Sequence, residues 1–365
     1  MALTVAIDGW GLSRGAAYRG VGTYTRQILA GLARTTDFDI VTFAERSAEL
    51  PAGVRRAPIV RLREHRYSQV EHEMLLPLDL RRRRADVLFE PAPDSPWHPP
   101  CPLVQTLHDA IPLVRDDPDI AWARRRWRRY VPRYRNARAV VAISRYTADE
   151  GIRVLGLDPR RVHVIHHGVD RSMFHPGPPP ARAPGDGGRP YVVMVNEYSQ
   201  RKGFDAAFAA IAGIADRGLP HQLRVAGRIM PWIRDELETL VAAAPRPERV
   251  ELLGFVDDLA GLYRGAAAAV VTSRHEGFGF PALEAMACGI PLVAWANTAT
   301  TEIVGEGGVL IPDGDMPGLV SELTRVVTDG GYAEELRQRG LARAEHFTWD
   351  ASIAMHADVL RSVAT

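Results

Sequence analysis

Two carboxylates and a glycine-rich turn form the most distinctive combination of residues in this sequence. The segment His275–Pro291 follows an apolar run, has Glu276 in a turn, and continues with helical periodicity through Glu284. A helix that starts beneath a glycine-rich turn presents N–H groups and the positive end of its dipole, which suit a phosphate. A carboxylate can accept hydrogen bonds from the vicinal hydroxyls of a sugar or a ribose. The segment therefore predicts a site for a nucleotide sugar.

Lys202 is the only lysine among the 45 basic residues of the chain, and it stands beside Arg201. The pair follows the strand-like run 190–195 and precedes the helical pattern 204–211, so we expect it in a strand-to-helix turn. An ammonium and a guanidinium fork at such a turn can neutralise a diphosphate. A solvated surface pair is the alternative, which the residues taken alone favour.

Four further candidate residues lie in the first half of the chain. His108 follows the strand-like run 103–107 and so lies at the carboxyl end of a predicted strand, although a lone histidine is more often a packing or surface residue. Asp109 could orient an acceptor hydroxyl or cap the following turn, and the sequence favours neither role. Gly20 and Gly22 precede a helical pattern and would let the backbone approach a ligand closely.

The segment Glu276–Pro291 resembles the signature of the GT4-type retaining glycosyltransferases (glycosyl transferases group 1), which have the GT-B fold. The family pattern Glu-Gly-Phe-Gly-x-Pro-x-x-Glu-Ala-Met-Ala-x-Gly-x-Pro runs here without a break. The basic pair before Gly203 and the segment from His108 to Pro112 also resemble family motifs. One version of the family has Gly-Arg where this chain has Asn196 and Glu197, a departure for which Arg201 could substitute.

The resemblance implies a role for each matching residue. His108, Glu276 and Asp109 form the catalytic set, in which Glu276 would hold hydroxyls of the donor sugar and His108 would position the sugar. Glu284 would hold the ribose. The remaining candidates are Arg201, Lys202, Gly20, Gly22, Phe278, Gly279 and Phe280 for the donor diphosphate, and Gly254, Phe255 and Val256 for the nucleoside.

The implied reaction moves a hexose-type sugar from a nucleotide diphosphate donor to an acceptor hydroxyl with retention of anomeric configuration. GDP-mannose is slightly favoured as donor and UDP-hexoses come next, while the acceptor could be a glycan, a glycolipid or a natural product. We expect no cofactor and no metal, because no Asp-x-Asp pair lies in a suitable turn. The alternatives are a sugar-nucleotide epimerase or hydrolase of the same architecture and a non-catalytic nucleotide-sugar-binding protein.

Length and patterning predict the architecture. At 365 residues and 46% hydrophobic content, the chain can form two domains. Apolar runs alternate with helical patterns, which predicts an α/β fold, and the resemblance implies two facing doubly wound Rossmann-like domains (GT-B) with an interdomain cleft. The strand candidates are 3–7, 38–43, 86–89, 103–107, 139–143 and 162–165 in the first half and 191–195, 222–226, 250–253, 268–272, 292–295 and 308–311 in the second.

The expected boundaries follow from composition. An N-terminal, acceptor-side domain would span 1–175, a linker rich in proline and glycine 176–189, and a nucleotide-sugar-binding domain 190–348. By resemblance, a terminal helix over about 349–365 would pack back on the first domain.

Charge and cysteine content narrow the partners and the location. A net charge of +1 gives no indication of nucleic-acid binding. Two cysteines are too few for a disulfide framework and favour a reducing cytoplasm. No apolar run approaches the roughly 20 residues of a membrane span. The segment Trp122–Arg135 is rich in arginine and aromatic residues, and could contact the inner membrane face or an anionic acceptor. A helix with a solvated basic face and inward aromatic side chains is the favoured interpretation.

Overall fold

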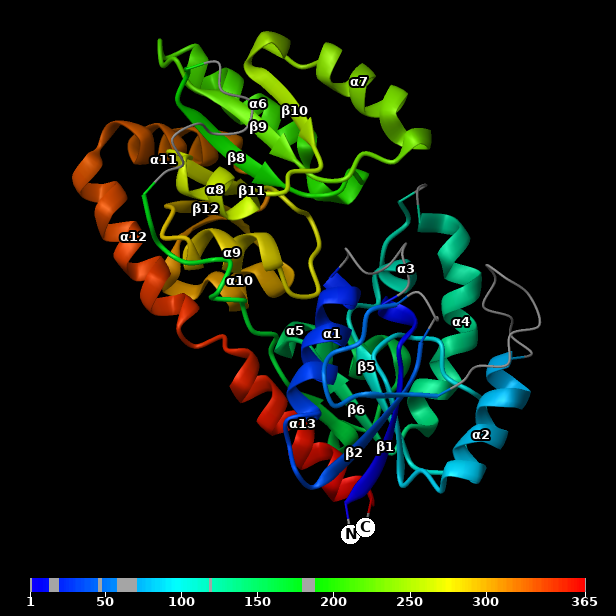
Figure 1. Ribbon diagram of the computed structural model, residues 1–365. Coiled ribbons are helices and arrows are strands. Elements are labelled where there is room, and N and C mark those ends of the chain that lie inside the picture. The colour runs from blue at the N-terminus through cyan, green and yellow to red at the C-terminus, as the bar shows by residue number, and fades with distance from the viewer. Residues whose placement is uncertain are drawn as a thin grey trace. The chain divides into compact units, whose positions relative to one another are not determined.

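The computed structural model describes residues 2–12, 20–44, 48–57, 71–117, 120–178 and 188–364. Contacts divide the chain into two compact units, Met1–Gly168 with Thr348–Thr365, and Val169–Phe347. Each unit is an α/β structure around a parallel sheet (Figure 1). Residues 169–175, which the sequence analysis assigns to the first domain, make their contacts within the second unit. Most of the expected linker, residues 179–187, lies outside the described residues.

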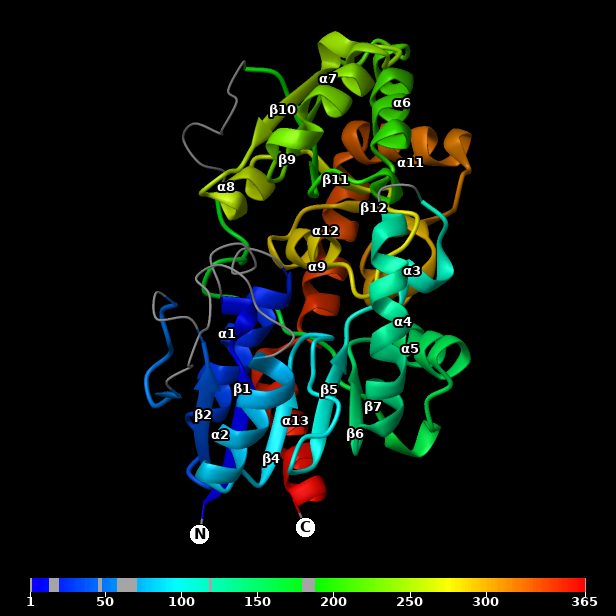
Figure 2. The ribbon, with the colours of Figure 1, turned by 90° about the vertical axis from the view of Figure 1, so that its right-hand side faces the viewer.

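The first unit has, in its described part, a seven-stranded sheet in the order β3-β2-β1-β4-β5-β6-β7. All neighbouring strands are parallel, and Figure 2 shows those from β2 to β7 side by side. The strand order reverses between β1 and β4, which makes this pair the topological switch point. The strands are β1 Leu3–Asp8, β2 Phe38–Phe43, β3 Arg55–Arg56, β4 Val87–Glu90, β5 Leu103–Leu107, β6 Ala139–Ala142 and β7 Val162–Val164.

Helices cover the first sheet, and the C-terminal helix belongs to this unit. Helix α13 packs on α1, β1 and β4, and a Cβ added to Gly31 of α1 would lie 2.0 Å from Ile353 Cδ1 of α13. A larger residue at 31 would therefore push the two helices apart. The helices are α1 Gly20–Leu32, α2 Leu76–Arg83, α3 Ile111–Val114, α4 Ala121–Asn136, α5 Arg145–Glu150 and α13 Trp349–Ala364.

The second unit has, among the described residues, a six-stranded parallel sheet in the order β10-β9-β8-β11-β12-β13. Its switch point lies between β8 and β11. The strands are β8 Tyr191–Val195, β9 Gln222–Ala226, β10 Val250–Gly254, β11 Ala268–Val271, β12 Leu292–Ala296 and β13 Val309–Pro312. The helices are α6 Phe204–Ala215, α7 Arg234–Ala242, α8 Leu259–Arg264, α9 Phe280–Ala287, α10 Thr298–Val304, α11 Met316–Thr328 and α12 Gly330–Ala344.

The core of the second unit explains why these segments fold as they do. Val192, Met194, Val270 and Val293 are fully buried strand residues that pack with Phe208 of α6. Strands covered on both faces need apolar runs of this kind rather than an alternating pattern. The predicted fold class, with two doubly wound parallel sheets, is confirmed. No helix within the described ranges is both long enough and apolar enough to cross a bilayer.

Candidate active site

The turn that carries Lys202 lies at the switch point of the second sheet. It follows β8 as a single 3-10 turn, Gln200–Lys202, and the segment after it touches the end of β11. Gly203 has a φ of 66°, and a Cβ there would lie 2.0 Å from the Thr272 carbonyl oxygen. Thr272 Oγ1 donates to the Gly203 carbonyl at 2.8 Å. Only glycine permits this approach, which brings Lys202 beside the chain that leaves β11.

Lys202, Arg201 and Glu276 form a charged cluster at this switch point. Lys202 Nζ lies 2.5 Å from Glu276 Oε1, and Arg201 Nη1 lies 3.7 Å from Glu276 Oε2. Burial raises the pKa of Glu276, but the charges of Lys202 and Arg201 outweigh burial and lower the pKa below its ordinary value. Glu276 is therefore ionised at neutral pH. Two cations face one carboxylate, so positive charge is in excess where a diphosphate would bind.

The loop after β12 holds the backbone of Glu276 in place. Thr298 Oγ1 accepts a hydrogen bond from the Glu276 N–H at 3.0 Å. Asn297 Nδ2 donates to the carbonyl of Ser273 at 2.9 Å. Thr298 has a φ of 41°, which is unusual for a β-branched residue and typical of positions fixed by a functional site. The segment 297–302 also resembles a family loop near the donor pyrophosphate, but only the folded structure brings Thr298 to the backbone of Glu276.

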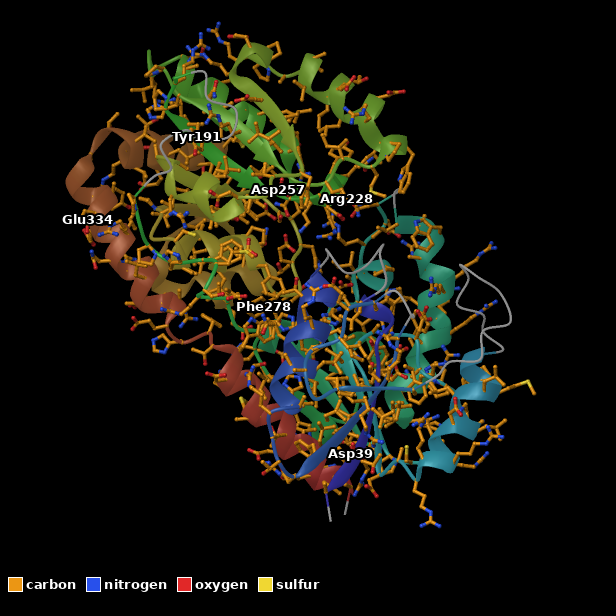
Figure 3. The ribbon with its side chains drawn as sticks, viewed as in Figure 1. Asp39, Tyr191, Arg228, Asp257, Phe278 and Glu334 are labelled. Carbon is orange, nitrogen blue, oxygen red and sulfur yellow. The ribbon has the colours of Figure 1, made fainter. Side chains whose placement is uncertain are left out.

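Helix α9 begins directly after the glycine-rich turn. Gly279 has a φ of 103° and precedes Phe280, with Pro281 in the first turn where its missing N–H costs nothing. The side chain of Phe278 is buried, with its ring centroid 5.3 Å from that of Phe280 and 6.0 Å from that of Phe347 (Figure 3). Any contact of this turn with a diphosphate would therefore come from the backbone and the helix dipole.

Glu284 lies on α9 in a different environment from Glu276. The Tyr263 hydroxyl lies 3.3 Å from Glu284 Oε2 and 3.2 Å from the carbonyl of Pro281. Burial raises the pKa of Glu284 to about 7, although the Tyr263 hydrogen bond acts in the opposite direction. The carboxyl thus changes charge near neutral pH, and its ionised form could accept two ribose hydroxyls.

The predicted nucleoside loop lies at the carboxyl edge of the same sheet. Gly254 ends β10 with a φ of 67°, and its carbonyl accepts from the Gly227 N–H at 2.9 Å. Phe255 is 62% exposed and Val256 is half-buried. The next residue, Asp257, is labelled in Figure 3 beyond the end of β10. An exposed aromatic ring at a strand end is compatible with stacking on a base.

In the first unit, His108 lies directly after β5. Its Nε2 is 2.7 Å from the carbonyl oxygen of Pro91. Because a carbonyl only accepts, this hydrogen bond assigns the proton to Nε2. Burial lowers the pKa of His108, so the ring is neutral and Nδ1 keeps its lone pair. A sugar hydroxyl could donate to that nitrogen.

Tyr24 joins His108 to the C-terminal helix. Its ring meets the His108 ring edge-on at 5.2 Å and lies 4.8 Å from the His167 ring. Its hydroxyl is 2.9 Å from Thr106 Oγ1 and 2.7 Å from His356 Nε2. These residues form the imidazole cluster, defined as His108, His167 and His356 together with Tyr24. His108 is half-buried and the other three are buried. No pattern in the sequence predicts this cluster, because its members come from distant segments.

The hydrogen bonds of this cluster have a defined direction. His356 Nδ1 is 2.7 Å from the carbonyl of Ser352, so Nδ1 carries the proton. Burial lowers the pKa of His356 to about 4, which leaves Nε2 as an acceptor. Tyr24 therefore donates to His356 and accepts from Thr106.

The other first-unit candidates have local structural roles. Asp109 Oδ1 accepts from the Ile111 N–H at 3.0 Å, so Asp109 caps the turn into α3. Gly20 is the first residue of α1, and Gly22 is buried in the same helical turn. The loop before them, residues 13–19, lies outside the described residues.

A pair of buried carboxyl groups at the switch point of the first unit was not predicted from the sequence. Asp8 and Glu90 end β1 and β4, the two strands of the switch point, and both are buried. Burial and the neighbouring Asp8 raise the pKa of Glu90 well above its ordinary value, which favours an uncharged carboxyl. The sequence signal was a carboxylate at the end of each strand, which becomes informative only once the strand order is known.

The segment Trp122–Arg135 forms most of α4 and largely has the favoured arrangement. Tyr130 and Tyr134 are buried, and the ring of Trp127 stacks on Tyr134 at 6.0 Å. Trp122, which is 70% exposed, and Arg133, which is buried, are the exceptions. Within the described ranges, no three His, Cys, Asp or Glu side chains are grouped closely enough to hold a metal ion.

Comparison with known proteins agrees with this geometry. Residues 18–172 match the profile described as Glycosyltransferase Family 4, and residues 189–329 match that described as Glycosyl transferases group 1. The chain belongs to this glycosyltransferase family. The first profile spans β2 to β7 and the second spans β8 to β13. The recognition of a GT4-type family from the sequence is confirmed.

Curated relatives match this chain over only part of its length. A D-inositol 3-phosphate glycosyltransferase of Catenulispora acidiphila is 34% identical over 241 residues, covering 61% of this chain and 57% of the relative. A GDP-mannose-dependent phosphatidylinositol dimannoside mannosyltransferase of Mycobacterium tuberculosis is 30% identical over 204 residues, covering 54% and 51%. The chain spans about half the length of these curated relatives.

Solved structures match along almost the whole chain. A sucrose-phosphate synthase of Thermosynechococcus elongatus has a TM-score of 0.78 at 21% identity, covering 99% of this chain and 98% of that one. Anabaena HepE in complex with UDP-glucose has a TM-score of 0.77 at 19% identity, covering 99% and 100%. These likenesses show that the chain has the GT-B fold.

Proposed function

We propose that this chain is a retaining glycosyltransferase that moves a hexose-type sugar from a nucleoside diphosphate to an acceptor hydroxyl. The observation that carries the proposal is the charged cluster of Arg201, Lys202 and Glu276 at the switch point of the second sheet. Doubly wound sheets bind ligands at this position. Family membership and the unbroken signature around Glu276 support the same activity.

The cluster suits a departing nucleoside diphosphate. Charge develops on the leaving phosphate as the glycosidic bond breaks, and fixed cations stabilise that charge without reorganising. Lys202 has three N–H donors, so a contact with Glu276 leaves it able to bind a phosphate oxygen. Arg201 and the start of α9 add positive potential. In this proposal Glu276 accepts from sugar hydroxyls.

The other candidate residues receive matching roles. His108 would accept a hydrogen bond from the sugar at Nδ1, because Nε2 is committed to the Pro91 carbonyl. Glu284 would hold the ribose hydroxyls. The backbone of Gly254, Phe255 and Val256 would frame the base, and Asp109 would orient the acceptor in addition to capping α3.

The donor and acceptor are proposed in order of support. GDP-mannose comes first, since one relative uses it by name and another, in Escherichia coli, is an O-antigen chain mannosyltransferase 36% identical over 121 residues. UDP-hexoses come next, since a protein of the same fold was solved with UDP-glucose. A hydroxyl of a glycan, a glycolipid or a natural product is the proposed acceptor.

We also propose a metal-independent reaction in the cytoplasm. Lys202 and Arg201 supply the charge that a divalent cation would otherwise supply. Cys101 and Cys288 are free thiols, the state that a reducing compartment preserves. A peripheral contact with the inner membrane face through the exposed Trp122 belongs to the proposal as a secondary element, and vesicle co-sedimentation of Trp122→Ala tests it.

Thermal stabilisation by nucleotides tests the donor site. GDP, UDP and their hexose conjugates should raise the unfolding midpoint of the wild type by mass action. Lys202→Ala should abolish the shift. Arg217→Ala removes the same charge from an exposed position of the second unit and serves as the matched control. Absence of any shift in the wild type would overturn the donor site.

Turnover separates the proposed function from its alternatives. Glycosyl transfer that requires an acceptor supports the proposal. Release of free or rearranged sugar without an acceptor would identify a hydrolase or an epimerase. Nucleotide binding with no turnover of any donor would identify a binding protein.

A further inference from the structure

A pocket of about 490 Å³ opens in the first unit at the edge opposite His108. Its walls include Leu103, the first residue of β5, Arg138, which precedes β6, and Arg161, which precedes β7. These positions mark the amino edge of the parallel sheet. His108 follows the carboxyl end of β5, which is roughly 16 Å away for a five-residue strand. A ligand in this pocket could not join the transfer reaction at His108.

Arg133 is the most deeply buried charged residue of the described lining. Its side chain is only 5% exposed, and its Nη2 donates to Glu73 Oε1 at 2.5 Å. Its guanidinium carbon lies 4.9 Å from the ring centre of Trp97, another lining residue. The buried Nε of Arg133 has no hydrogen-bond partner in the part of the chain that the structure describes. A buried N–H of a charged group without an acceptor is costly, and a bound anion nearby would be attracted by the positive charge of this guanidinium.

Two further arginines stand at the pocket. Arg138 is exposed and forms no ion pair with any described residue. Arg161 is held only weakly, with Nη1 3.5 Å from the Ala137 carbonyl and Nε 3.9 Å from Asp158 Oδ2. No carboxylate is among the described lining residues. The pocket therefore offers guanidinium donors that the protein itself does not use.

The remaining lining suits a compact ring. Trp97 is 37% exposed, and Pro96, Pro99 and Leu103 add apolar surface beside it. The volume lies within the range of small-molecule sites, roughly 300–1,000 Å³. Arginine forks match the geometry of phosphate oxygens, and a phosphate monoester carries close to two negative charges at neutral pH.

We propose that the pocket formed by Trp97, Arg133, Arg138 and Arg161 binds a sugar phosphate as an effector. The phosphate contacts Arg138 and Arg161, with Arg133 behind them, and the ring lies against Trp97. This site is independent of the proposed transfer activity, because it lies at the other edge of the sheet from His108.

Calorimetric titration of the full chain tests the site with three probes: glucose 6-phosphate, inorganic phosphate and glucose. We expect the two phosphates to bind the wild type and glucose not to bind. Arg138→Ala combined with Arg161→Ala should weaken binding at least tenfold. The matched control is Arg125→Ala with Arg129→Ala, which removes the same charge from exposed positions of α4 and should bind like the wild type. A thermal midpoint for each variant verifies that it is folded.

The donor site is a competing phosphate site, and Lys202→Ala distinguishes it. Binding that survives Lys202→Ala and is lost in the Arg138/Arg161 variant supports the proposal. The reverse pattern would overturn it, as would the lack of binding by the wild type. Capture by vesicles that contain phosphatidic acid, without binding of glucose 6-phosphate, would overturn it in favour of a lipid headgroup.

Discussion

The carboxyl edges of the two sheets carry titratable groups with opposite charge states: a carboxylate that stays ionised in the second unit and imidazoles that stay neutral in the first. In the second unit, Glu276 is buried beside Lys202 and Arg201 and stays charged. In the first unit, His108 and His356 are held by carbonyl oxygens and stay neutral. Both groups lie in buried environments, so burial alone does not decide the charge.

The presence of a counter-charge makes the difference. A buried group without one adopts its neutral form, while a buried group beside an opposite charge remains ionised. In the proposed function, the fixed positive charges of the second unit stabilise the donor diphosphate. In the same proposal, the neutral ring of His108 accepts a hydrogen bond from a sugar hydroxyl at Nδ1. The contrast predicts that the two units respond differently to mutation and to pH.

The largest expected effect is on the charged cluster. Lys202→Ala should lower kcat/KM by roughly 100- to 1,000-fold, because it removes a fixed cation from the leaving phosphate and leaves Glu276 with the more distant Arg201 as its neighbouring cation. Steady-state kinetics with the donor that stabilises the protein measures the effect. A loss below tenfold would place the diphosphate elsewhere.

Acid should destabilise the imidazole cluster. The pKa of His356 is about 4 in the folded unit and 6.5 when unperturbed, so the unfolded chain takes up its proton first as the pH falls. The stabilisation is present above pH 6.5 and is lost between pH 6.5 and about 4. Over this range the free energy of unfolding falls by about 3 kcal/mol.

Urea unfolding across this pH range measures that loss. His356→Gln should show a shallower decline than the wild type, while His346→Gln at an exposed position should follow the wild type. Equal slopes for His356→Gln and the wild type would show that His356 is not the titrating group.

Removing one hydroxyl should weaken the link between α1 and α13. Tyr24→Phe keeps the ring against His108 but leaves His356 Nε2 and Thr106 Oγ1 without their shared partner. A buried acceptor left unpaired costs roughly 1–3 kcal/mol. Calorimetric or urea unfolding measures the change, and Tyr332→Phe, a less buried hydroxyl bound to Glu322, should cost much less.

The smallest expected effect concerns Glu284 and has the opposite pH trend. Its pKa is raised from 4.5 to about 7, so its neutral form stabilises the fold below pH 4.5 and that contribution is lost as the pH rises through 7. Above neutral pH, Glu284→Gln should therefore be more stable than the wild type. The expected difference in the free energy of unfolding is on the order of 1 kcal/mol, because solvent screens the charge of this partly exposed side chain. The difference should shrink in acid. A constant difference would contradict a pKa near 7.

Local patterning accounts for most of the predicted architecture. The runs 103–107 and 191–195 fold as β5 and β8 with the expected bounds, because buried parallel strands need continuous apolar residues. The two-residue strand β3, Arg55–Arg56, could not be found this way, since its residues carry no apolar pattern and pair only with β2. The signature helix was predictable because its glycines and proline act locally.

The sequence by itself determined the two α/β units with their parallel sheets, the turn at Gly203, the helix after Gly279 and membership of the glycosyltransferase family. These depend on backbone conformation and apolar periodicity, which neighbouring residues specify. Only the tertiary structure decided that Lys202 pairs with Glu276 and that Tyr24 donates to His356 across a sequence separation of 332 residues. Such pairings and the pKa values they set depend on strand order and burial, which arise when distant segments pack together.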